Sequence, residues 1–159
     1  MRNTIAQCRK ALVDELSRVH SSEVKMASIL PSLWTSAEMP ELADLLRQFL
    51  SESHLHARLL RELQSALGGP ICPTQWEGFA AAVNEMLDQA AHVPGNHARD
   101  LMLVGGLIRI KGLKIAGYNV VRSIAENLQS HQMMTIIIKM VLTEMEGEIK
   151  LFEIASELA

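Results

Sequence analysis

Four long segments of the sequence repeat apolar residues every three or four positions, and this period constrains the fold more than any other feature. Such spacing places the apolar side chains on one face of an α-helix. The predicted helices cover about residues 4–36, 40–67, 96–129 and 130 to near the end of the chain. No segment sustains the strict apolar–polar alternation of a half-buried strand, and no hairpin turn pair is present. The sequence therefore predicts an all-α protein.

The connections between these helices predict how they are arranged. Only a few residues join the first helix to the second, or the third to the fourth, so each pair should form an antiparallel hairpin. About thirty residues separate the two hairpins, and they include a short amphipathic segment with Trp76, Phe79, Val83 and Leu87 on one face. Two hairpins joined by one long crossover are typical of ferritin-like bundles. We expect residues 1–159 to form a single ferritin-like four-helix-bundle domain with a short helix in its crossover.

Composition excludes several classes of protein. The net charge is −3, with acidic and basic residues interspersed, so we expect no nucleic-acid partner. Cys8 and Cys72 are too few and too far apart for a disulfide framework or a zinc site. The start of the chain, "MRNTIAQCRK", lacks the apolar run of a signal peptide, and "MMTIIIKMVL" is too short and interrupted to cross a bilayer. We therefore expect a soluble, cytoplasmic protein with no membrane partner.

Charged residues interrupt the apolar face of every predicted helix near its middle. They are, in chain order, Glu23, Glu52 with His56, Lys111 with Lys114, and Glu144 with Glu148. In an antiparallel bundle the midpoints of the helices lie at a common height, so these side chains should converge on one buried layer. A single interruption is more often a register error or a side chain that reaches solvent at the edge of the stripe. Four interruptions at matching height are difficult to explain in that way.

Several carboxylates buried together predict a bound cation, since each would otherwise be protonated or expelled. In the di-metal carboxylate bundles, two helices each supply one Glu and the other two each supply a Glu with a nearby His. Carboxylate and imidazole ligands together suit iron or manganese. The candidate metal ligands are Glu23, Glu52, His56, Glu144 and Glu148.

The sequence resembles the YciF-type bacterial stress proteins, a ferritin-like family of unknown biochemical activity, over nearly the whole chain. The similar stretches are "DELSRVHSSEVK", "LPSLWTSAEMPELADLL", "SESHLHARLLRELQSALG", "IAGYNVVRSIAENL" and "LTEMEGEIKLFEIASELA". The resemblance implies an acidic ligand at Glu23, a pair at Glu52 and His56, and a second pair at Glu144 and Glu148. On its own, it would imply a di-iron or di-manganese centre.

Two lysines depart from the family pattern. The third helix of the family typically reads like "VEHYEIAAY", whereas this chain has "IKGLKIAGY", so Lys111 and Lys114 stand where the family has carboxylates. Two positive charges about 4 Å apart repel by about 4 kcal/mol at an effective dielectric constant of about 20. The four glutamates bring −4 and the lysines +2 if both point inward. The remaining charge of −2 would be compensated by one divalent ion, by bound protons, or by water together with an outward tilt of the side chains. Deprotonated Lys114 as a neutral ligand is an alternative, which the surrounding carboxylates disfavour.

We therefore expect a stress-associated, non-catalytic bundle whose di-metal site is degenerate, with Lys111 and Lys114 in an ion-pair network. It would hold either no cofactor or one divalent ion, iron or manganese, instead of an intact di-iron centre. The alternative is a metal-binding ferritin-like protein with an oxidoreductase, peroxide-protective or storage role. A third reading, an anion pocket or a reactive lysine, rests on one residue type.

The apolar band "MMTIIIKMVL" on the last helix is wider than one bundle core needs. Together with the family resemblance, this band predicts a homodimer. The sequence identifies no other protein partner.

Overall fold

The computed structural model describes residues 2–68 and 74–159, so Cys72 lies outside the described residues. The described residues form five helices and no β-strand, which confirms the predicted all-α class. The helices are α1 (Arg2–Ser36), α2 (Pro40–Ala66), α3 (Glu77–His92), α4 (Asn96–Asn127) and α5 (His131–Leu158).

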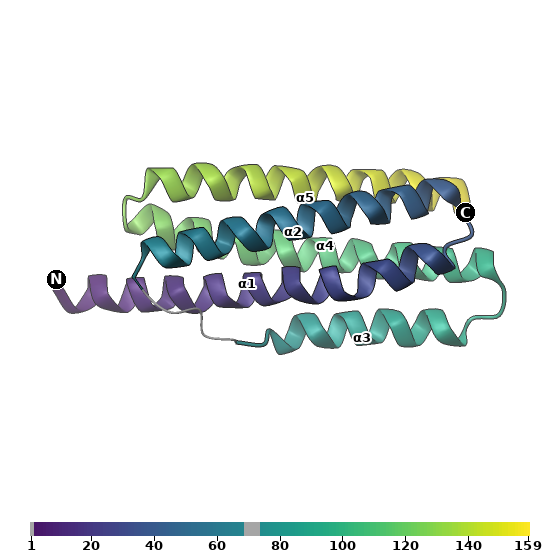
Figure 1. The fold of residues 1–159 in the computed structure, drawn as a ribbon, viewed down its shortest axis with the longest axis horizontal. Coiled ribbons are helices and arrows are strands. Elements are labelled where there is room, and N and C mark those ends of the chain that lie inside the picture. Colours follow the sequence, from purple (N-terminus) through teal and green to yellow (C-terminus); the bar gives the residue numbers. More distant parts are fainter. Residues whose placement is uncertain (1, 69–73) are drawn as a thin grey trace.

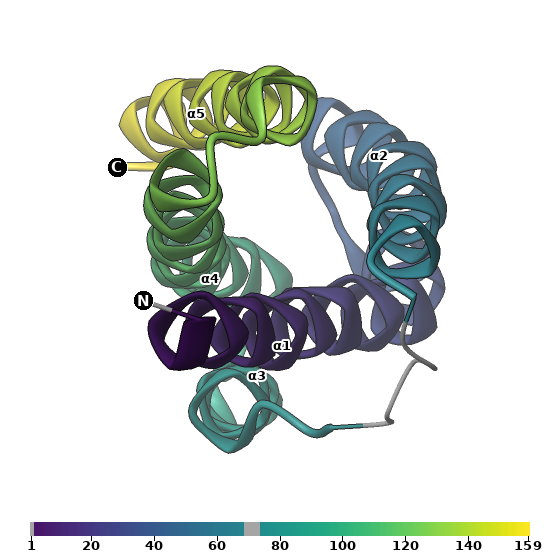
Figure 2. The ribbon, with the colours of Figure 1, turned by 90° about the vertical axis from the view of Figure 1, so that its left-hand side faces the viewer.

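Four of the helices, α1, α2, α4 and α5, form the corners of a bundle that Figure 2 shows nearly end-on. The hairpins α1–α2 and α4–α5 are antiparallel and pack side by side (Figure 1). Helix α3 lies outside this ring against α4 and α1, and it carries the chain from one end of the bundle back towards the other. This arrangement confirms the ferritin-like four-helix bundle with a helix in its crossover.

The α1–α2 turn is tied to α4 by one buried carboxylate. Pro40 is the first residue of α2, where its missing N–H costs nothing, but the preceding residue, Met39, has no side-chain oxygen with which to cap the helix. Asp100 of α4, which is fully buried, accepts N–H groups from Glu38 at 3.0 Å and Met39 at 2.8 Å. Asp100 of the second hairpin therefore accepts hydrogen bonds from the backbone N–H groups just before α2 of the first hairpin.

The apolar core consists of two clusters, one towards each end of the bundle. One is formed around Leu30, Leu42, Phe49 and Leu107, and the other around Leu16, Leu60, Val121 and Ile137. Each cluster takes residues from all four bundle helices. The charged residues lie in the sequence between the members of these two clusters, at mid-height of the bundle.

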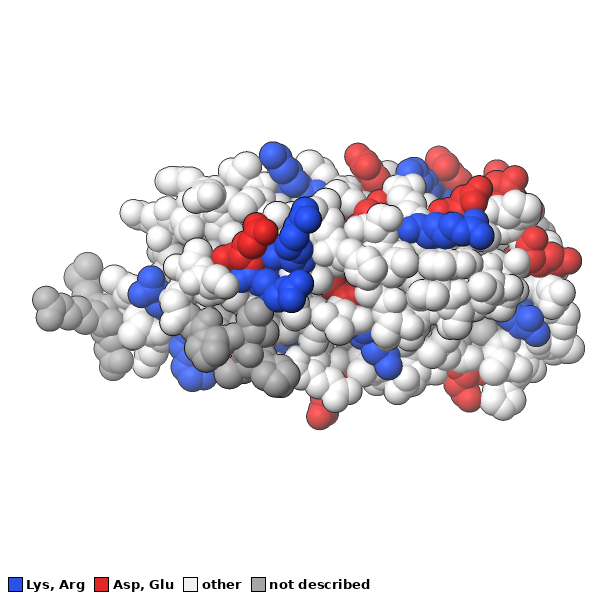
Figure 3. Space-filling model, in the orientation of Figure 1, with Lys and Arg blue, Asp and Glu red and all other residues white. Residues whose placement is uncertain are grey.

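No helix in the described part of the chain has an apolar stretch that could span a lipid bilayer. On the face shown in Figure 3, basic and acidic side chains are interspersed, with no large area of one sign.

Candidate functional site

A layer of charged side chains lies between the two apolar clusters. Its members are Glu23 of α1, His56 of α2, Lys111 and Lys114 of α4, and Glu144 of α5, and each is at most 3% exposed. Each belongs to the bundle-facing side of its helix, and residues of the two apolar clusters lie before and after it along that helix. The layer is therefore shielded from solvent by the core itself.

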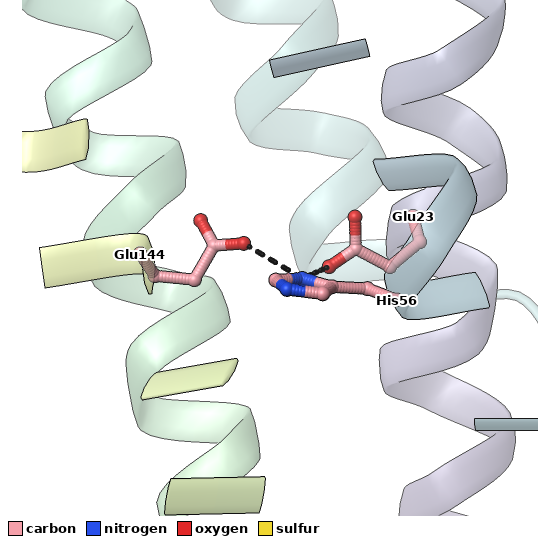
Figure 4. Close-up of side chains that lie close together, drawn as sticks. All are labelled: Glu23, His56 and Glu144. Atoms are coloured by element: carbon pink, nitrogen blue, oxygen red, sulfur yellow. Dashed lines mark hydrogen bonds and ion pairs between the residues drawn. The ribbon is translucent and has the colours of Figure 1, made fainter. Parts of the chain in front are cut away.

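Glu23, His56 and Glu144 form the centre of this layer. The His56 Nδ1 atom lies 3.4 Å from Glu23 Oε1 and 3.2 Å from Glu144 Oε1, so the ring is held between two carboxylates from opposite sides of the bundle (Figure 4). One ligand atom from each residue lies within 4.8 Å of the others. By type and spacing, these three groups could hold one metal ion.

The ammonium group of Lys114 contacts the same two carboxylate oxygens. Its Nζ lies 3.0 Å from Glu23 Oε1 and 2.6 Å from Glu144 Oε1. Both oxygens also face His56 Nδ1. A cation supplied by the chain itself therefore bridges these two carboxylates.

Lys111 extends the network towards the edge of the layer. Its Nζ lies 2.8 Å from Glu144 Oε2 and 3.8 Å from Glu52 Oε2, and 3.7 Å from the centre of the Phe49 ring. An ammonium group over an aromatic face gains a further electrostatic attraction. The absence of a side chain at Gly147 makes this arrangement possible, because a Cβ there would come within 2.8 Å of the Phe49 ring and 3.1 Å of Lys111 Nζ.

These contacts determine the charge of each group. Burial raises the pKa of Glu144, but the charge of Lys114 and the hydrogen bond from His56 outweigh it and hold that pKa well below its usual range. The pKa of Glu23 is lowered in the same way, by Lys114 and His56 against burial. Burial lowers the pKa of Lys114, but the two glutamates raise it above its usual value. The pKa of Lys111 is lowered, by burial and then by Lys114. Lys114 is therefore a fixed cation at neutral pH and a poor nucleophile.

His56 makes the stability of the layer depend on pH. Burial lowers the pKa of His56, but hydrogen bonds and charges from Glu144 and Glu23 outweigh burial and raise the pKa above 6.5. A raised folded-state pKa gives stability that is complete below the unfolded value and is lost as pH rises through the folded value. The free energy of unfolding in urea should therefore fall as pH rises above about 6.5, the ordinary pKa of His. His56→Gln should remove this dependence, and an unchanged pH profile in that variant would contradict the assignment.

Tyr118 belongs to the layer and was not among the residues proposed from the sequence. It is fully buried on α4, its hydroxyl donates to Glu23 Oε1, and its ring lies edge-on to His56 with the centres 5.9 Å apart. Burial, Glu23 and Glu144 raise the pKa of Tyr118 well above 10, so it stays a hydrogen-bond donor. The available signal was its position one turn after Lys114, which places both on the same helix face.

The structure does not bring Glu52 and Glu148 into the centre. The Glu52 side chain is 16% exposed, accepts a hydrogen bond from Gln48 at 2.7 Å, and reaches only Lys111 at the edge of the layer. Glu148 is half-buried, and the ion pairs and side-chain hydrogen bonds found among the described residues do not include it. The central layer therefore carries two carboxylates against two lysines, whereas the sequence predicted four against two.

These residues do not fit a di-metal centre. Three potential ligand residues converge, and two ammonium groups contact the same carboxylates. The remaining capacity is small, because Glu23 Oε2 is the one buried oxygen of the Glu23 and Glu144 carboxylates that has neither a hydrogen-bond partner nor an ion pair within the described part of the chain. A single ion at Glu23, His56 and Glu144 would require Lys114 Nζ to move away from both glutamates.

A cavity of about 570 Å³ lies between α1 and the residues that lead into α3. Its walls include His20, Val24, Trp76 and Phe79 but none of the charged residues of the layer. This cavity therefore gives a solute no direct access to the ion pairs.

A family model described as "Domain of unknown function (DUF892)" matches residues 7–159. Among solved structures, the E. coli stress protein YciF is similar, with a TM-score of 0.88 and 18% identity over 95% of this chain and 96% of that one. YcfI from Rhodopseudomonas palustris is also similar, with a TM-score of 0.86 and 18% identity over 91% and 92% of the two chains. At this identity the likeness shows the fold alone. A comparison with curated proteins finds no significant match.

Proposed function

Because the chain belongs to the DUF892 family, for which no activity is defined, we propose from its own residues that it is a non-catalytic, stress-associated ferritin-like bundle. Its metal site is degenerate, and an ion-pair network of lysines and glutamates takes the place of the metal ions. The stress association rests on the likeness to the E. coli stress protein.

One observation carries this proposal. Lys114 Nζ lies within 3.0 Å of Glu23 Oε1 and 2.6 Å of Glu144 Oε1 in a layer with almost no solvent exposure. A metal ion at ligand distance from both oxygens would lie close to this ammonium group, and two positive charges at about 4 Å repel by about 4 kcal/mol at an effective dielectric constant of about 20. Lys111 adds a second positive charge on Glu144.

The charge balance supports a layer that is complete without metal. Glu23 and Glu144 bring two formal negative charges, and Lys111 and Lys114 bring two formal positive charges. His56 adds a proton that the same carboxylates favour, and Glu52 at the edge of the layer can compensate it. Buried charges that are paired and hydrogen-bonded in this way need no further cation.

The second candidate is a protein that binds one divalent ion, with iron or manganese as the ion. It is favoured by the convergence of Glu23, His56 and Glu144 within 4.8 Å and by the unpartnered Glu23 Oε2. Oxidative chemistry of the di-iron type needs a second metal, for which these residues provide no further converging ligands.

Metal analysis of the purified protein tests the proposal. Protein expressed with iron and manganese supplied, and then passed through a desalting column, should contain well under one equivalent of either metal per chain. One equivalent that is lost on replacement of His56 with Ala would support the single-ion candidate instead. Two equivalents per chain would overturn the proposal.

A further inference from the structure

Helix α5 exposes a row of large apolar side chains on its outer side. We call this row the α5 stripe, and it consists of Ile138, Leu142, Met145, Ile149 and Phe152, which are 41–57% exposed. The steps between them alternate four and three residues, so they lie on one face of the helix, over a length of about 20 Å. The residues that α5 buries in its own bundle, such as Ile137 and Leu151, lie on the opposite face.

The stripe differs from the apolar band that the sequence suggested as an interface. Within "MMTIIIKMVL", the bundle core takes up Met133, Ile137 and Met140, and the exposed apolar residues are Ile138 and Leu142. The other members of the stripe lie further along the helix, beyond that band. The exposed apolar surface therefore extends from Ile138 to Phe152, and a contiguous apolar patch rimmed by polar residues is typical of an interaction site.

We propose that the α5 stripe binds the α5 stripe of a second copy of this chain, with the two helices antiparallel. The alternating steps of four and three are those of the a and d positions of a coiled coil, which pack against an equivalent row. In this register Leu142 lies opposite the partner subunit's Met145, and Ile138 lies opposite the partner subunit's Ile149. Such an interface uses the same surface twice and closes on itself, so it gives a dimer and no fibre.

The charges beside the stripe select this register. In this register Lys139 lies beside the stripe, across from the partner subunit's Glu146. The two-fold symmetry of the dimer gives this pair twice. Lys139 and Glu146 are exposed, and neither is found in an ion pair elsewhere in residues 2–68 or 74–159. A parallel arrangement would set Glu148 against the partner subunit's Glu153. Moving the antiparallel helices by half a heptad would set Glu146 against the partner subunit's Glu146. Like charges oppose both alternatives.

If the chain forms this dimer, light scattering of the wild-type protein should give twice the 17.6 kDa mass of one chain. Leu142→Glu, which buries a charge in the stripe, should give the mass of one chain. The matched control is Val24→Glu, at an apolar residue of α1 that is similarly exposed, 51% against 53%, and this variant should stay dimeric. Wild-type protein with the mass of one chain at every concentration would overturn the proposal, as would dissociation of the Val24 variant to the same extent.

A charge reversal tests the register without placing charge in the stripe. Lys139→Glu should raise the dimer dissociation constant by about tenfold or more, because two attractive pairs become repulsive. Lys139→Glu combined with Glu146→Lys should return the dissociation constant to the wild-type value, because both ion pairs form again with the charges exchanged. A double variant that dissociates as readily as the single one would overturn the antiparallel register. Neither test involves the charged layer, so the result is independent of metal content.

Discussion

Replacing Lys114 with methionine should lower the free energy of unfolding by about 3–5 kcal/mol, the usual cost of removing one partner from a buried ion pair. Methionine keeps most of the length and volume of the side chain, so the loss reports the missing charge more than a cavity. Glu23 and Glu144 would then share the layer without the cation that lies within 3.0 Å of both. Urea unfolding at neutral pH in the presence of a chelator measures the change.

The matched control is Lys10→Met, which removes a lysine from an exposed ion pair with Asp14. Surface pairs of this kind contribute little, so the control should unfold almost as the wild type does. A Lys114→Met variant that is no less stable than the Lys10 control would mean that the ammonium group does not neutralise the buried glutamates.

Lys111→Glu combined with Lys114→Glu should convert the layer into a metal site. The substitutions replace two positive charges with two carboxylates, which the family resemblance of the sequence implies for these positions, next to Glu23, His56 and Glu144. Without metal this variant should be strongly destabilised, since four carboxylates would be buried together. With Mn²⁺ or anaerobic Fe²⁺ at about one hundred times the dissociation constant, binding should return about 2.7 kcal/mol.

Thermal unfolding with and without metal checks this second result, and metal analysis should find up to two ions per chain. The wild type serves as the control, and its unfolding temperature should not depend on either ion. If the double variant neither takes up metal nor gains stability from it, the layer is not a converted di-metal site, and the lysines have another origin.

The sequence predicted the fold well because local signals and the apolar period agree. The predicted second helix, residues 40–67, begins at Pro40 and ends at Ala66 in the structure. Proline suits the first helical turn, and the paired glycines that follow weaken a helix. The short connections determine which helices form hairpins, and the long crossover leaves room for α3. These features depend on neighbouring residues, so one sequence is enough to read them.

Glu52 and Glu148 were harder to place from the sequence, because a step of three residues and a step of four residues both fit an apolar stripe. In α2 the buried face continues from Phe49 to Ser53, and Glu52 lies beside it. In α5 it continues from Glu144 to Gly147, and Glu148 lies beside it. Adjacent residues are about 100° apart around a helix, so the choice depends on where the neighbouring helices pack. Periodicity in one segment carries no information on that packing.

Tyr118 was missed for a different reason. An aromatic residue on a helix face is usually part of the core, and nothing in the sequence indicates that its hydroxyl reaches Glu23, 95 residues away. The structure shows this contact because α1 and α4 pack side by side. Polar partners that are distant in sequence follow from tertiary packing, and local propensity does not report them.

The central claim is that the Lys114 ammonium group occupies the position of a metal ion. An anomalous difference map at the iron and manganese absorption edges, from crystals of protein expressed with both metals, tests this most directly. We predict no anomalous peak among Glu23, His56 and Glu144, and density for Lys114 Nζ between the two carboxylates. Two anomalous peaks bridged by glutamates, or a Lys114 side chain that points to bulk water, would contradict the claim.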